Sequence, residues 1–240
     1  MKTFAAIWTI SLFLAVGAHA ADCRDETFEA MSFTVCKADP ATDDIRLFLN
    51  DADGTPLGTF SNLEDRLDGK ALVFAMNAGM YHPDRRPVGL YVEDGKTLSK
   101  IVTREGPGNF GLLPNGVLCL TDGAAQIVES RAFAKAEPTC RYATQSGPML
   151  VIDGKLHPRF LAKSTSRYLR NGVGIGADGA LLAVISNQPV NFHRFARFFR
   201  DVLGTRNALY MDGKVSRLYA PGLNRHDIGF PMGPMLGVVE

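Results

Sequence analysis

This sequence has almost no tryptophan and almost no excess of positive over negative charge. The 240 residues include one tryptophan, and 26 lysines and arginines almost balance 25 aspartates and glutamates, so the formal net charge is +1. The chain also has no dense run of lysine and arginine, the electrostatic footprint of proteins that bind nucleic acid or anionic lipid. We therefore expect no nucleic-acid partner.

Long apolar runs are missing too, except at the beginning of the chain. Lys2 precedes an apolar run over residues 4–16, and Ala18-His19-Ala20 fits the small-x-small pattern of a signal-peptide cleavage site. The run is too short for a comfortable bilayer span. We therefore predict a cleaved signal peptide at residues 1–20, a single domain over residues 21–240, and a periplasmic or secreted protein that does not insert into the membrane after cleavage.

The four cysteines, Cys23, Cys36, Cys119 and Cys140, include no CxxC pair, which argues against a zinc site. An even number of cysteines in an exported chain favours disulfides instead, and four cysteines allow three pairings. We favour Cys23–Cys36 and Cys119–Cys140 because each pair closes a short loop, although the sequence itself does not choose among the pairings.

Apolar alternation and short apolar runs dominate the rest of the chain. Alternation over residues 31–35 and 45–49 is typical of half-buried strands, and Asp53-Gly54 is typical of a hairpin turn. Further strands are predicted at residues 72–76, 90–92, 117–120, 126–128, 149–152, 173–175, 181–185 and 208–211. Because the turns between them are tight, we expect mostly antiparallel neighbours.

Helix signals are few. Residues 192–203 repeat apolar residues at a helical spacing, with Asn191 as a capping residue and Gly204 at the end. The capping box Ser61-Asn62-Leu63-Glu64 predicts one more short helix. The helix at 192–203 follows one predicted strand and precedes another, which allows one parallel crossover. The predicted fold class is α+β, with mixed, mainly antiparallel sheets and few helices in a single compact domain.

Standard catalytic motifs are absent from the sequence, which contains no P-loop, no HExxH and no GxSxG. The pair Asp-Gly occurs seven times, and most of these pairs are explained as turns. Asp212-Gly213 differs from the others because it ends an apolar run directly after the predicted helix at 192–203. A carboxylate at a strand end, beside a glycine that lets a ligand approach, is well placed for catalysis.

Four segments then occur in an order that resembles the phosphodiester glycosidase family. They are Asn77-Ala78-Gly79-Met80-Tyr81 followed by Pro87-Val88-Gly89-Leu90, then Gln145-Ser146-Gly147-Pro148-Met149-Leu150, then Arg170-Asn171-Gly172-Val173-Gly174-Ile175, and finally Ala208-Leu209-Tyr210-Met211-Asp212-Gly213. The resemblance covers roughly residues 70–239. An activity of this family is the removal of N-acetylglucosamine from a sugar phosphodiester.

The resemblance implies two groups of site residues. It implies catalytic roles for Asp212, Arg170, Asn77 and Ser146, and substrate binding by Gly79, Tyr81, Gly147, Gly213, Ser216 and Arg217. The sequence departs from the family pattern at Lys214, where a second glycine is usual, and at Arg217, where a small hydroxyl residue is usual. These departures leave open a different substrate or a loss of activity.

The chemistry of these residue types fits a sugar phosphodiester. A guanidinium matches phosphate oxygens in a bidentate way, so Arg170 or Arg217 is suited to hold the phosphate. The carboxylate of Asp212 can stabilise an oxocarbenium-like centre, act as a nucleophile or activate water. Asn77 and Ser146 are expected to donate hydrogen bonds to sugar hydroxyls or phosphate oxygens. No cofactor and no metal site is implied, and a divalent cation near Asp212 stays an alternative for which the sequence shows no complete ligand set.

The function predicted from the sequence is an exported hydrolase of sugar phosphodiesters, like N-acetylglucosamine 1-phosphodiesters, or of related glycosides. Its partner is a carbohydrate or sugar-phosphate substrate. Two alternatives stay open: a non-catalytic carbohydrate- or phosphate-binding envelope protein on the same scaffold, and a structural envelope protein. The sugar, the bond that is cleaved and the oligomeric state are not determined by the sequence.

Cleavage of the predicted signal peptide has a direct spectroscopic consequence. Trp8, the only tryptophan, lies within residues 1–20, so we expect the exported protein to show tyrosine absorption without tryptophan emission. The full-length chain retained inside the cell serves as the control and keeps this emission. Tryptophan fluorescence from the purified exported form would contradict cleavage.

Overall fold

The computed structural model describes residues 21–212 and 215–240. The predicted signal peptide lies outside the described residues. The largest sheet has seven strands in the order β1 (Asp22–Phe28), β2 (Met31–Ala38), β13 (Leu181–Ser186), β12 (Asn171–Ile175), β14 (Ala208–Tyr210), β10 (Met149–Ile152) and β11 (Lys155–Leu156). Every strand pairing that the described residues form is antiparallel.

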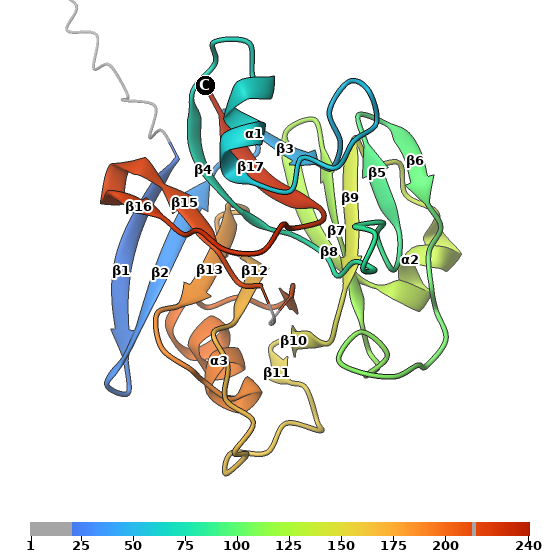
Figure 1. Cartoon of the computed structure of the whole chain (residues 1–240). Coiled ribbons are helices and arrows are strands. Elements are labelled where there is room, and N and C mark those ends of the chain that lie inside the picture. Colours follow the sequence, from blue (N-terminus) through green and yellow to red (C-terminus); the bar gives the residue numbers. More distant parts are fainter. Residues whose placement is uncertain (1–20, 213–214) are drawn as a thin grey trace, which may run out of the picture.

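Two five-stranded sheets complete the β-structure (Figure 1). One has the order β16 (Arg225–His226), β15 (Leu218–Ala220), β4 (Leu72–Asn77), β17 (Met235–Val239) and β3 (Asp44–Phe48). The other has the order β6 (Lys96–Ser99), β5 (Tyr91–Glu93), β9 (Tyr142–Ser146), β7 (Gly116–Thr121) and β8 (Ala124–Glu129). All three sheets contribute buried side chains to one shared core, among them Leu47, Phe74, Leu118, Val173 and Leu209.

The helices are short and lie outside this shared core. They are α1 (Phe60–Arg66), α2 (Ser130–Ala136) and α3 (Phe192–Arg197), and α3 continues as a π-helical turn over Phe198–Val202. The side chain of Asn191 caps α3 by accepting a hydrogen bond from the Arg194 backbone N–H at 2.9 Å, as the sequence predicts. The expected capping box of α1 is wrong, because Thr59 caps this helix by accepting from Asn62 N–H at 3.1 Å.

Strand β13 shows why both faces of the large sheet are apolar. Leu181, Ala183 and Ile185 face the shared core, whereas Leu182 and Val184 belong to a second core cluster. This second cluster also contains Phe195, Phe198 and Phe199 from α3 and its π-helical turn. Since side chains alternate between the two faces of a strand, burial of both faces requires the continuous apolar run that the sequence has there.

The connection through α3 refines the predicted crossover. It joins β13 to β14, and both strands pair antiparallel with β12, which lies between them. The two strands therefore run in the same direction without being neighbours. The α+β fold class with mainly antiparallel sheets and few helices is confirmed.

Both predicted disulfides are present. Cys23 and Cys36 face each other across β1 and β2, and Cys119 of β7 is joined to Cys140 just before β9. Disulfides are typical of oxidising compartments such as the periplasm or the cell exterior. Among residues 21–212 and 215–240, no helix is long and apolar enough to cross a membrane.

The packing of α3 leads to a stability prediction. Phe198 is fully buried and stacks on Phe33 of β2 with ring centroids 4.1 Å apart. We expect Phe198→Ala to lower the free energy of unfolding by about 3–5 kcal/mol, because it removes a large buried side chain and leaves a cavity. Urea denaturation measures the change. Phe230→Ala, at a phenylalanine that is 81% exposed, is the matched control and should change stability by no more than about 0.5 kcal/mol; equal losses in both variants would contradict the assigned packing.

Candidate active site

The candidate site lies where ends of strands from all three sheets meet. Asn77 is the last residue of β4, Ser146 the last residue of β9 and Asn171 the first residue of β12, and Asp212 follows β14. Direct hydrogen bonds connect these ends, from Asn77 to Asn171 and to Asp212, and from Ser146 to the residue before Asp212. The topology therefore brings together residues that are up to 135 positions apart in the sequence.

Asn77 and Asn171 form a buried pair of amides that joins two sheets. The Nδ2 of Asn171 donates to the Asn77 carbonyl at 2.7 Å, and the Nδ2 of Asn77 donates to Asn171 Oδ1 at 3.2 Å. Asn77 Oδ1 accepts the backbone N–H of Arg217 at 2.9 Å. Both side chains are fully buried, so the pair satisfies polar groups that cannot reach water.

This amide pair fixes the backbone of Asp212. The Asp212 N–H donates to Asn171 Oδ1 at 3.2 Å, and the Asp212 carbonyl accepts from Asn77 Nδ2 at 3.3 Å. The hydroxyl of Ser216 donates to the same carbonyl at 2.8 Å. Three side chains therefore hold the backbone of Asp212, which lines the neighbouring cavity.

The cavity beside Asp212 has a volume of about 660 Å³. Its lining combines one carboxylate, two arginines, three tyrosines and several apolar side chains: Met80, Tyr81, His82, Pro83, Arg85, Val88, Gly108, Asn109, Ser166, Tyr168, Arg170, Tyr210, Asp212 and Val215. Aromatic walls with a few polar groups are typical of sites for small polar ligands. Asp212, Arg170 and Tyr81, which the sequence selected, thus share one cavity.

Arg170 is held rigidly beneath this cavity. Its Nε donates to the Val190 carbonyl at 2.9 Å, its Nη2 to the Ser166 carbonyl at 3.2 Å and its Nη1 to the Tyr210 hydroxyl at 3.4 Å. The ring of Phe192 lies 3.7 Å from the guanidinium carbon. Burial lowers the pKa of Arg170 from its ordinary value, but a guanidinium keeps its proton in proteins. Arg170 thus adds a fixed positive charge, although much of its hydrogen-bonding capacity is used inside the protein.

Two tyrosines beside Asp212 stay neutral at ordinary pH. Burial, and then the Asp212 carboxylate, raise the pKa of Tyr81 to about 12. Burial also raises the pKa of Tyr210 to about 12, against the opposing effect of Arg170. Within the described residues, the buried hydroxyl of Tyr81 has no hydrogen-bond partner. Its neutral O–H is thus a donor that the described residues leave unused beside the cavity.

Asn77 and Ser146, which we expected to donate hydrogen bonds to the substrate, lie away from the cavity lining. Neither residue lines the cavity, both are fully buried, and the Ser146 hydroxyl donates to the Met211 carbonyl at 2.8 Å. The geometry argues against direct hydrogen bonds from these side chains to a sugar. They are positioning residues that hold the segment leading to Asp212.

The remaining residues selected from the sequence lie at different places. A methyl group on Gly79 would collide with Thr144 and Gln145, and one on Gly147 would lie 2.6 Å from Asn115 Cβ, so both glycines permit close packing of segments. Gly213 and Lys214 lie outside the described residues. Ser216 and Arg217 line a separate cavity of about 460 Å³, which shares Val215 with the first one.

Sequence reasoning missed Asn171 and Tyr210 as site residues, although both stand inside the segments that define the resemblance. It also missed His82 and Arg85, which reach the cavity from a turn in which the Arg85 N–H donates to the His82 carbonyl at 2.8 Å. A polar residue at the start of an apolar strand was an available signal for Asn171. The turn residues gave no comparable signal.

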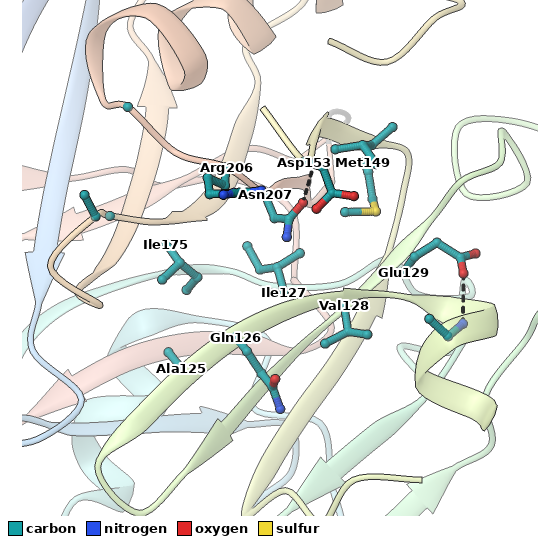
Figure 2. A pocket seen from close by; sticks show the side chains of 15 residues that line it. Ala125, Gln126, Ile127, Val128, Glu129, Met149, Asp153, Ile175, Arg206 and Asn207 are labelled. Atoms are coloured by element: carbon teal, nitrogen blue, oxygen red, sulfur yellow. Dashed lines mark hydrogen bonds between the residues drawn. The ribbon is translucent and has the colours of Figure 1, made fainter. Parts of the chain in front are cut away.

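A further cavity of about 710 Å³ lies between β8 and the ends of β10, β12 and β14 (Figure 2). Its polar groups include Glu129, which caps α2 by accepting from two backbone N–H groups at 2.9 Å, and Asn207, which accepts from the Asp153 N–H at 2.9 Å. None of the catalytic residues predicted from the sequence lines this cavity. In the described part of the chain, no group of three or more His, Cys, Asp or Glu residues is arranged to hold a metal ion.

A carboxylate and two guanidinium groups line one aromatic, polar cavity, a lining suited to a polar ligand that carries negative charge. A family model for phosphodiester glycosidases matches residues 70–239, and the chain belongs to this family of hydrolases. YigE of Escherichia coli K12 is 33% identical over 222 residues, which cover 92% of this chain and 85% of YigE.

Two solved structures share the fold. The catalytic domain of zebrafish N-acetylglucosamine-1-phosphodiester alpha-N-acetylglucosaminidase, auto-inhibited by its pro-peptide, matches with a TM-score of 0.62 and 15% identity, over 92% of this chain and 82% of that one. A Burkholderia pseudomallei protein described as exported matches with a TM-score of 0.59 and 13% identity, over 87% of this chain and 74% of that one. At these identities the likeness concerns the fold alone.

The amide pair can be tested through stability. We expect Asn77→Ala to lower the free energy of unfolding by at least about 2 kcal/mol, because it leaves the buried Arg217 N–H without an acceptor and removes a donor from the Asp212 carbonyl. Chemical denaturation measures this loss. Asn109→Ala, at an exposed asparagine of the cavity rim, is the control and should stay within about 0.5 kcal/mol of wild type. A loss for Asn77→Ala no larger than for the control would show that the pair does not stabilise the fold.

Proposed function

We propose that this protein is an exported hydrolase that cleaves sugar 1-phosphodiesters, with the Asp212 carboxylate acting at the anomeric centre. The observation that supports it most is the shared cavity: Asp212, Arg170 and Tyr81 line one space of about 660 Å³. Membership in the phosphodiester glycosidase family supports the same reaction class.

The carboxylate is suited to a developing positive charge. Hydrolysis at the anomeric carbon breaks its bond to the phosphate oxygen, the electron pair leaves with the phosphate, and water supplies the hydroxyl of the released sugar. The transition state has oxocarbenium character, which an adjacent carboxylate stabilises, either through charge, as a nucleophile or by activating the water. The anchored Asp212 backbone limits reorganisation during this step.

The phosphate side of the substrate is matched by positive charge and by a neutral donor. Arg170 and Arg85 both line the cavity, and Arg85 lies over the Tyr81 ring with its guanidinium carbon 5.5 Å from the ring centroid. Charged hydrogen bonds from guanidinium groups stabilise phosphate oxygens. The Tyr81 O–H can add a hydrogen bond to the departing oxygen, and its pKa of about 12 keeps the proton in place at neutral pH.

Aromatic side chains supply the walls that a sugar ring needs. Tyr168, Tyr210 and Tyr81 come from three different segments, and Tyr168 is 55% exposed at the rim. Such surfaces pack against the apolar faces of a sugar while the polar groups fix its hydroxyls. The chemical identity of the sugar is set by these contacts, and N-acetylglucosamine is the first candidate because of the family.

Turnover is the test of the proposed function. Purified protein is offered a panel of N-acetylglucosamine 1-phosphodiesters, and we expect Asp212→Asn to lower kcat by at least ~100-fold, because the neutral amide can neither stabilise the cationic centre nor activate water. Release of free sugar is measured. Asp153→Asn, in the cavity of Figure 2, is the matched control and should keep wild-type activity.

Two outcomes would overturn the proposal. Equal turnover by wild type and Asp212→Asn would remove Asp212 from the chemistry. Binding of the panel by both proteins, without turnover by either, would favour a non-catalytic carbohydrate-binding protein on the same scaffold.

A further inference from the structure

Arg217 is a buried cation without a partner of opposite charge. Its side chain is 7% exposed, and only its backbone is bonded, through the N–H that donates to Asn77 Oδ1 at 2.9 Å. Within residues 21–212 and 215–240, its guanidinium forms no hydrogen bond and no ion pair, whereas Arg170 donates to two carbonyls and a hydroxyl. Burial lowers the pKa of Arg217 from its ordinary value, against the opposing effects of Tyr81 and Asp227.

Asp227, the carboxylate that acts on the pKa of Arg217, already accepts hydrogen bonds from other groups. Asp227 Oδ2 accepts from the Arg225 guanidinium at 2.8 Å and from the Leu218 N–H at 3.0 Å. Arg225 also donates to Thr34 and Asn187. The charges of Arg225 and Asp227 therefore neutralise each other, and both side chains have their own hydrogen-bond partners. The positive charge of Arg217 is not balanced by this pair.

The guanidinium is fixed at the edge of an open space. The cavity of about 460 Å³ is lined by Leu169, Val215, Ser216, Arg217, Arg225, His226, Asp227 and Ile228. On one side the guanidinium packs against Gly229 so closely that a Cβ there would collide with it. Leu169, Val215 and Ile228 add apolar side chains to this open lining.

This cavity adjoins the candidate active site. Val215 lines both spaces, and Ser216, which lines the second one, donates to the Asp212 carbonyl. A substrate whose sugar phosphodiester occupies the first cavity can therefore extend past Val215 into the second. Arg217 lines the second space and not the first, so an anion bound to it lies beside the group in the first cavity.

We infer that Arg217 forms a second oxyanion subsite, which binds a phosphate group carried by the substrate beyond its scissile phosphodiester. The inference rests on the proposed function for the role of this group, but the subsite itself is defined by the buried, unpartnered guanidinium and the cavity in front of it. The substrate class is a sugar 1-phosphodiester whose other half bears a further phosphate.

Binding of inorganic phosphate tests the subsite without any turnover. Calorimetric titration at low salt should show phosphate binding by the wild-type protein, a loss of at least about tenfold in affinity for Arg217→Gln, and an intermediate affinity for Arg217→Lys, which keeps the charge without the planar donor array. Arg104→Gln, at an exposed arginine, is the control and should bind as wild type does.

Unchanged phosphate affinity in both Arg217 variants, or no binding by the wild type, would overturn the inference. If Arg217→Gln does not fold, Gly229→Ala decides in its place, because it displaces the guanidinium and leaves the charge present. Wild-type affinity in a folded Gly229→Ala protein, together with wild-type affinity in Arg217→Lys, would equally overturn it.

A pair of substrates separates this inference from the proposed function. Arg217→Gln should raise KM about tenfold more for an N-acetylglucosamine phosphodiester with a second phosphate on its other half than for one with a neutral other half. Asp212→Asn should lose kcat for both. If Arg217→Gln treats the two substrates as wild type does, the subsite fails while the hydrolase stands; if nothing is turned over but phosphate binding depends on Arg217, the subsite stands without the hydrolase.

Discussion

The buried amide pair of Asn77 and Asn171 is the interaction on which the candidate site depends. It joins a strand of one sheet to a strand of another through two reciprocal hydrogen bonds, and the same two side chains hold both polar atoms of the Asp212 backbone. A primary amide can donate two hydrogen bonds and accept others, whereas an ionised carboxylate only accepts and a hydroxyl has a single hydrogen to donate. Burying an amide is unfavourable unless its polar atoms form hydrogen bonds. Both amides do so here, and their bonds to the Asp212 backbone hold this residue at the cavity.

Much of the fold can be predicted from the sequence because buried faces of strands and helices require apolar residues at regular spacing. β13 reads as an unbroken apolar run since both of its faces are buried, and α3 was found from its spacing and its Asn191 cap. β1 was missed because its residues are mostly polar and exposed, so its pairing with β2 leaves no apolar pattern. The cap of α1 was misplaced because Ser61 fits the capping pattern as well as Thr59 does, and only the three-dimensional path of the chain decides between them.

The sequence could indicate which segments meet at the candidate site, but not how their side chains are arranged there. The order of four segments selected Asp212, Arg170 and Tyr81, which share a cavity. Their order says nothing of which way a side chain points, so Asn77 and Ser146 were assigned to substrate although they bond inside the protein. The partner of Asn77 lies 94 positions away, and a contact of that separation leaves no signal in any window of a single sequence.

The two arginines beside the site show how the surroundings of one functional group define its role. Arg170 is enclosed by Phe192 and bonded to carbonyls and a phenol, so its charge is spread into neighbouring dipoles and stays fixed whether or not a ligand is present. Arg217 has a comparable burial and no such dipoles, with a space in front of it instead. An anion that binds there can accept hydrogen bonds from a guanidinium that forms none with the described residues. The first arginine therefore shapes the field at Asp212, whereas the second one selects what can lie beside it.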